Sequence, residues 1–89
     1  MICFELYLNG ERLCRAGKED MTVLTSILSY VASTGKEEEL LLTVSGLLTS
    51  SEGHVHSSWL QAHDVQVGDE VTIKIVAADT ADDPSSETI

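Results

Sequence analysis

Three histidines and two cysteines are the side chains with the most versatile chemistry in this chain of 89 residues. His54 and His56 stand two positions apart, so on a strand both imidazoles would lie on one face and reach the same ion. His63 and Asp64 follow and could complete such a site. The alternative is that the histidines lie exposed in a polar loop. Because the cysteines form no Cys-x-x-Cys pair, we expect neither a metal site nor another cofactor.

Pairs of a nucleophile and a base can also be assembled from this sequence. Cys14 with His63 and Ser57 with His56 are such pairs, but neither lies in a local signature such as a nucleophile elbow. The chain is rich in serine, so such pairs are expected by chance. The glycines are isolated and form no phosphate-binding loop. We therefore expect that the protein has no catalytic residues and is not an enzyme.

The charge balance narrows the class of partner. Five Lys and Arg residues stand against 15 Asp and Glu residues, which gives a net charge of −10. Affinity for nucleic acids and for anionic membranes depends on basic side chains, so we expect neither as a partner. The same charge suits a basic protein partner, whose approach the electric field would accelerate.

We expect a cytoplasmic protein, because the sequence has no sign of membrane insertion or export. No apolar run approaches the roughly 18–20 residues that a membrane-spanning helix needs. The first residues lack a basic region followed by an apolar one, and Glu5 would interrupt a signal core. Cys3 and Cys14 fall in two segments predicted to pair, which could bring them near enough for a disulfide. Thiols of an unexported chain are more often reduced, however.

The first 16 residues predict a β-hairpin. In residues 2–8, apolar and more polar side chains alternate, which is the period of a half-buried strand. An Asn-Gly dipeptide follows, which accepts positive φ at both central positions of a tight turn, and residues 11–16 return as the second strand. A two-residue turn would place Glu5 opposite Cys14, whereas a bulge at the turn glycine would shift this register.

Residues 20–34 predict an amphipathic helix. Apolar side chains spaced three and four residues apart would form one stripe along it. They are Leu24, Ile27, Leu28 and Val31. Asp20 would cap the N-terminus of this helix, and Gly35 would end it.

The second half of the chain predicts further strands. Residues 40–45 and 70–77 alternate in hydrophobicity, and residues 70–77 give the clearer pattern. Residues 54–60 fit either a short strand or an irregular segment. Residues 46–53, which lie between them, are expected to form a loop with two leucines tucked under it.

The last residues differ in composition from the rest. Residues 79–89 are rich in Ala, Asp, Ser and Thr, with four acidic residues, no basic one and a single proline. Such a segment has too little apolar surface to offset the entropy of ordering it. We therefore expect one domain over residues 1–78 and a flexible acidic tail over residues 79–89.

This order of elements predicts an α+β fold, with a mixed sheet of four to five strands and one helix packed on one face. The first and last strands are the most apolar, so we expect them side by side at the centre. The order resembles that of ubiquitin-like β-grasp proteins. Residues 1–16 resemble their opening hairpin, and residues 60–76 resemble their leucine-initiated turn and final strand. The chain is also similar to short uncharacterised bacterial proteins with a Leu-Asn-Gly hairpin and a Gly-Asp-Glu-Val-Thr-Ile ending.

One departure from the ubiquitin-like pattern bears on function. Ubiquitin-like modifiers and sulfur carriers act through a C-terminal Gly-Gly, whose carboxylate is activated. This chain ends in Ser-Glu-Thr-Ile and has no glycine after Gly68. The resemblance therefore implies a binding scaffold and not a conjugated or sulfur-carrying protein.

Five side chains are candidates for binding a partner. Trp59 is either a core residue or an interface anchor, and Tyr7 stands on the polar face of the first strand. Leu41, which shares its face of the strand with Thr43, is either covered by residues 46–63 or joins Tyr7 and Val76 in an exposed patch. The predicted binding surface comprises Tyr7, Leu41, Thr43, Trp59 and Val76.

These features predict a non-catalytic protein–protein interaction module. It would bind a protein partner through this sheet-face patch, with acidic surroundings that set specificity and association rate. The alternative is a small acidic inhibitor or immunity-type protein that occludes a basic site on an enzyme or nuclease. An open sheet of this size also exposes an edge strand, which would permit a strand-paired homodimer.

Overall fold

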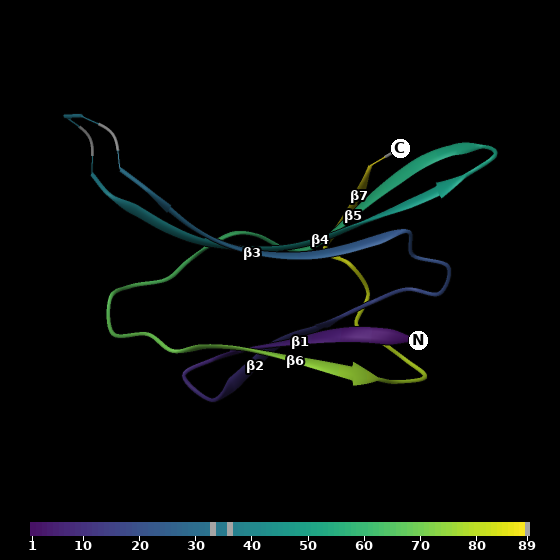
Figure 1. Ribbon diagram of the computed structural model, residues 1–89, viewed down its shortest axis with the longest axis horizontal. Coiled ribbons are helices and arrows are strands. Elements are labelled where there is room, and N and C mark those ends of the chain that lie inside the picture. Colours follow the sequence, from purple (N-terminus) through teal and green to yellow (C-terminus); the bar gives the residue numbers. More distant parts are fainter. Residues whose placement is uncertain (33, 36, 89) are drawn as a thin grey trace.

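Two antiparallel sheets packed face to face form the protein, as the computed structural model shows for residues 1–32, 34–35 and 37–88 (Figure 1). The first sheet has the order β2-β1-β6 and the second has the order β3-β4-β5-β7. The strands of the first sheet are β1 (Ile2–Leu8), β2 (Glu11–Ala16) and β6 (Val71–Ala77). Those of the second are β3 (Val23–Val31), β4 (Glu39–Ser50), β5 (Gly53–Asp64) and β7 (Ser86–Thr88).

The expected α+β β-grasp fold is wrong, because the segment predicted as a helix is strand β3. The described residues contain no helix. This segment carries apolar side chains on both faces, so its spacing fits a helical stripe and a strand equally well. Many of its residues are β-branched or aromatic, which favours a strand. All nine residues of β3 pair with β4, and this long-range ladder decides the conformation.

The opening hairpin is confirmed, with one change of register. Asn9 and Gly10 form the tight turn with φ of 52° and 83°. The register shifts between Leu6 and Tyr7 and leaves Leu13 as an extra residue on β2. This bulge is not at the turn glycine, and it places Glu5 opposite Arg15 instead of Cys14.

The bulge has a consequence for charge. Arg12 and Arg15 are three positions apart, so in a regular strand they would point to opposite faces. With the extra residue Leu13 between them, Arg12 pairs with Tyr7 and Arg15 pairs with Glu5. Both guanidinium groups therefore lie on the outer face of the first sheet.

The rest of the strand predictions are confirmed in outline, but the strands are longer than expected. Strand β4 contains the strand predicted over residues 40–45 and continues to Ser50, through the region expected to be a loop. The segment that fitted either a strand or an irregular stretch belongs to β5, which is 12 residues long. β1 and β6 are adjacent as expected, with β1 central and β6 at the sheet edge.

The core lies between the two sheets. Its buried members are Leu6, Cys14, Ala16, Leu42, Val44, Trp59 and Val65. The sheets approach each other most closely at β2 and β5. Along the chain they are joined by residues 65–70 near one end, and by residues 17–22 and 78–85 near the other (Figure 1).

The segment expected to be a flexible tail is bonded to both sheets. The Asp82 N–H donates to the Arg15 carbonyl at 2.9 Å, and the Asp82 carboxylate accepts from the Arg15 N–H at 2.8 Å. The Asp82 carbonyl accepts from Trp59 Nε1 at 2.8 Å. The Ser85 N–H and hydroxyl both donate to the Ser58 carbonyl. Residues 78–85 therefore form a strap, which closes the side of the sandwich along β2 and β5.

Replacement of Asp82 tests the strap. We expect Asp82→Ala to lower the free energy of unfolding by about 1 kcal/mol, because the Arg15 N–H loses a charged acceptor. Asp82→Asn keeps an acceptor oxygen in the same place and should lose less. Urea unfolding followed by the fluorescence of Trp59 measures both. Equal stability of Asp82→Ala and wild type would contradict the role of the strap.

Candidate functional site

The inner faces of the edge strands β3 and β6 can be identified from their register. Ile73 of β6 pairs with the buried Leu6, and Leu28 of β3 pairs with the buried Leu42. Residues directly opposite each other in an antiparallel pair point to the same face of the sheet. Ile73 and Leu28 therefore belong to the faces that enclose the core.

These inner-face side chains are nevertheless exposed. Ile73 and Ile75 of β6 are 46% and 73% exposed, and Leu28 and Tyr30 of β3 are 57% and 61% exposed. The side of the sandwich along β3 and β6 is thus not closed, in contrast to the side along β2 and β5. We call these exposed inner-face residues of the two edge strands, Leu28, Tyr30, Ile73 and Ile75, the open side.

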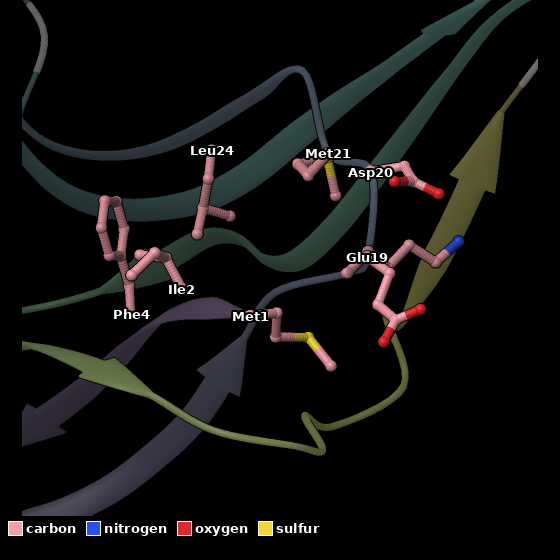
Figure 2. A pocket seen from close by; sticks show the side chains of 8 residues that line it. Met1, Ile2, Phe4, Glu19, Asp20, Met21 and Leu24 are labelled. Carbon is pink, nitrogen blue, oxygen red and sulfur yellow. The ribbon is translucent and has the colours of Figure 1, made fainter.

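A pocket of about 430 Å³ lies near one end of the sandwich, between the two sheets (Figure 2). It is lined by Met1, Ile2, Phe4, Lys18, Glu19, Asp20, Met21 and Leu24. Phe4 and Leu24 come from opposite sheets and point toward each other across it. Phe4 pairs with Ile75 in the first sheet, and Leu24 lies on the inner face of β3 with Leu28. The pocket therefore neighbours Ile75 through Phe4, whereas on β3 the inner-face residue Ser26, whose hydroxyl is buried, separates Leu24 from Leu28.

The segment between β2 and β3 gives the pocket an acidic rim. Glu19 and Asp20 both line it, and Asp20 has a left-handed backbone with φ of 62°, which aspartate tolerates better than most residues. The ammonium of Lys18 is engaged with the Glu87 carboxylate at 2.6 Å. Two carboxylates without a basic partner among the described residues therefore stand beside apolar walls.

Met21 sits in the pocket because Gly46 leaves room for it. A Cβ at Gly46 would lie 2.8 Å from Met21 Sδ and 3.0 Å from the Val23 carbonyl oxygen. Such distances are below van der Waals contact, so the sulfur or the backbone would have to shift. The shape of this pocket wall therefore depends on a glycine in the neighbouring strand β4.

A second cluster of charged side chains lies on the outer face of the first sheet. Glu5 Oε2 accepts from Arg15 Nε at 2.8 Å and from Arg12 Nη1 at 3.3 Å, and Glu5 Oε1 accepts from Tyr7 Oη at 3.0 Å. The hydrogen bond from Arg15 is the main cause that lowers the pKa of Glu5 below its ordinary value. Three neighbouring side chains donate to this carboxylate, so the cluster is an ion-pair network within the protein.

Removal of the Glu5 charge tests that network. Because the pKa of Glu5 is lowered in the folded state, its contribution to stability is present above the ordinary glutamate pKa and lost as the pH falls. We expect Glu5→Gln to be less stable than wild type at neutral pH. This deficit should close as the medium becomes acidic. Urea unfolding at several pH values measures it, and a deficit that stays constant with pH would refute the assignment.

The two cysteines lie on opposite faces of the first sheet and cannot be bridged to each other. Both are free and buried. Cys14 pairs with Leu6 and faces the core, whereas Cys3 lies on the outer face beneath Gly17, where an added Cβ would be 2.7 Å from its sulfur. Burial, with a contribution from the Asp82 charge, raises the pKa of Cys14 to about 11.

Thiol labelling tests this burial. At pH 8 a thiol with this pKa is ionised in about one molecule in a thousand, and only the thiolate reacts. We expect the native protein to react with an aromatic disulfide reagent far more slowly than the urea-unfolded protein. Cys3→Ser and Cys14→Ser each retain one thiol, so the labelling rate of each cysteine can be measured separately. Rapid labelling of Cys14 in native Cys3→Ser would contradict the burial.

The histidines are not brought together. His54 and His56 lie opposite Thr49 and Leu47 on the outer face of the second sheet, and His54 Nδ1 is 3.0 Å from the Thr49 hydroxyl. His63 is at the other end of β5. Within the residues that the structure describes, no three His, Cys, Asp or Glu side chains are grouped to hold a metal ion.

The five residues predicted to bind a partner are distributed over three places. Tyr7 and Val76 lie on the outer face of the first sheet, where Lys74 Nζ is 4.7 Å from the Tyr7 ring centre. Leu41 and Thr43 lie on the outer face of the second sheet. Trp59 is 5% exposed and belongs to the core. The structure therefore does not join them into one surface.

The sequence pattern does not predict the open side. Leu28 was assigned to the buried stripe of a helix, and the apolar residues of β6 were assigned to a central strand. One signal was available. Residues 23–31 contain no charged residue, proline or glycine, although the chain as a whole carries a charge of −10. Such a run indicates either a strand that is covered within the protein or an exposed strand that binds a partner.

No protein-family model matches the chain, and no curated protein or solved structure matches it either. In the part of the chain that the structure describes, no helix has the length and apolarity needed to cross a membrane.

Proposed function

We propose that the protein is a non-catalytic interaction module that binds a polypeptide segment of a partner along the open side and in the nearby pocket. The observation that carries this proposal is the exposure of inner-face apolar residues on β3 and β6. Soluble proteins rarely leave a contiguous apolar surface uncovered unless it serves an interaction.

The composition of this surface suits a protein interface. Interface cores are depleted in charged residues and enriched in aromatic ones, and Tyr30 supplies an aromatic ring beside Leu28 on β3. Ile73 and Ile75 add exposed apolar side chains on the inner face of β6. The pocket adds a concave site for one apolar anchor side chain, with apolar walls from Ile2, Phe4 and Leu24.

The acidic rim defines the chemistry of the partner. An apolar side chain that enters the pocket would bring its sequence neighbours close to Glu19 and Asp20. A Lys or Arg beside that apolar residue would meet complementary charge there. The net charge of −10 would also raise the association rate with a basic partner. The preferred segment is therefore apolar with an adjacent basic residue.

A second candidate function follows from the same charge. A small protein with 15 acidic and five basic residues could occlude a basic site on an enzyme or nuclease as an inhibitor or immunity-type protein. Binding of that kind would weaken steeply as salt rises, whereas binding through the open side, with one basic residue at the acidic rim, would weaken only modestly. The free, buried thiols of Cys3 and Cys14 support a cytoplasmic setting for either function.

Selection of peptides displayed on phage tests the proposed function. We expect the enriched peptides to share a large apolar residue beside Lys or Arg, and their affinity to fall about tenfold or more for Ile2→Asp, which places a charge in the pocket wall. Val67→Asp is the matched control, because Val67 is 95% exposed and outside the pocket.

Two outcomes would refute the proposal. One is enrichment of peptides that bind Ile2→Asp as tightly as wild type, which would place their site elsewhere. The other is that no peptide is enriched on the folded protein. Urea unfolding of Ile2→Asp and Val67→Asp must first show that both variants fold.

A further inference from the structure

Strand β3 is an edge strand without the usual protection against pairing. Its nine residues include no charge, no proline and no glycine, and Val23, Ile27 and Val31 are each about half exposed. Every second residue of an edge strand directs its N–H and C=O away from its own sheet. β3 therefore offers a ladder of backbone hydrogen-bonding groups flanked by apolar side chains.

The other edges that the structure describes are protected. β6 carries Lys74 at its middle, so two copies paired there would bring like charges together. The β2 edge is occupied at Arg15 by Asp82 of the strap. β7 is only three residues long. The contrast singles out β3 as the edge on which another strand can add.

The sequence of β3 is close to self-complementary about Ile27. In an antiparallel pair of two identical strands centred on this residue, Val23 would oppose Val31 and Thr25 would oppose Ser29. Leu24 would oppose Tyr30, which pairs two apolar side chains on the inner face. Ser26 opposite Leu28 is the one unlike pair. The side chains that meet across such an interface are thus mostly matched in kind.

We propose that two copies of the protein associate through β3, antiparallel and in register at Ile27, to form a continuous sheet of eight strands. We take a second copy as the occupant, because its own β3 supplies this matched order of residues. A two-fold pair of this kind is closed and consumes both edges. This inference goes beyond the proposed function and does not rest on it.

The two-fold symmetry of this dimer would also bring the open sides of the two copies next to each other. Strands paired antiparallel across a two-fold axis keep the same face of both copies on the same side of the sheet. Leu28 and Tyr30 of both copies would therefore form the floor of one trough, with β6 of each copy as its walls. The end of β3 next to the hairpin turn reaches past the first sheet and is accessible for this pairing (Figure 1).

Charge outside the strand opposes the association. Glu19 and Asp20 precede β3, and the three glutamates at positions 37–39 follow it. Antiparallel pairing would bring the first group of one copy near the second group of the other at both ends of the interface. Salt screens such repulsion, so the dimer should be favoured by high ionic strength. This is the reverse of the response expected for binding to a basic partner.

Sedimentation velocity of the purified protein tests the dimer. We expect a monomer–dimer equilibrium that shifts toward the dimer as salt or protein concentration rises. Ile27→Lys should raise the dimer dissociation constant about tenfold or more, because it brings two ammonium groups together at the two-fold axis. Val67→Lys places the same charge at a residue that is 95% exposed and outside every strand, and should leave the equilibrium unchanged.

Oxidative cross-linking tests the register. Two residues directly opposite in an antiparallel pair have Cα atoms within the range that a disulfide spans. Ile27→Cys should therefore form a covalent dimer under mild oxidation, and Cys3 and Cys14 are buried and should not interfere. Thr25→Cys should cross-link poorly alone and efficiently together with Ser29→Cys.

The result that overturns the proposal is a monomer at all salt and protein concentrations, or assembly that continues beyond a dimer. Equal association of Ile27→Lys and wild type would also overturn it, as would equal cross-linking of Thr25→Cys and Ile27→Cys. Circular dichroism and urea unfolding verify that Ile27→Lys keeps the fold, and the cross-linking remains a separate measurement should it unfold. None of these experiments involves a peptide ligand, so their failure is distinct from that of the proposed function.

Discussion

The attachment of Asp82 to both sheets is the interaction on which the architecture depends. Its backbone and carboxylate bond to Arg15 of the first sheet, and its carbonyl accepts from Trp59 of the second. These bonds hold the sandwich together along β2 and β5. Nothing equivalent joins β3 to β6 among the described residues. Asymmetric closure thus creates the open side, and the candidate site is a direct result of it.

The sequence predicts the local parts of this fold and fails where distant segments decide. The Asn-Gly turn and the alternation of β1 and β6 are local signals, and both hold in the structure. Strand β3 could not be distinguished from a helix, because a stripe at spacings of three and four also arises when both faces of a strand are apolar. Only the ladder with β4 selects between them, and pairing partners cannot be read from one segment.

The candidate site was accessible to prediction only in part. Acidic charge and exposed apolar residues were expected, but their location depends on which edges the two sheets leave uncovered. Composition also gave no indication that residues 79–88 would bond to the domain, because the strap is held by backbone groups and one carboxylate. Backbone hydrogen bonds require little from the side chains, so a polar segment can be ordered without an apolar face.

The late position of the strap in the chain bears on synthesis at the ribosome. β3 and β4 emerge from the exit tunnel well before β6, which completes the first sheet, and before Asp82, which fixes that sheet to the second. During this interval the uncharged β3 and the unfinished core are accessible to other nascent chains, and incomplete β-structure of this kind is prone to aggregation. The strap therefore closes the sandwich only once nearly the whole chain is available.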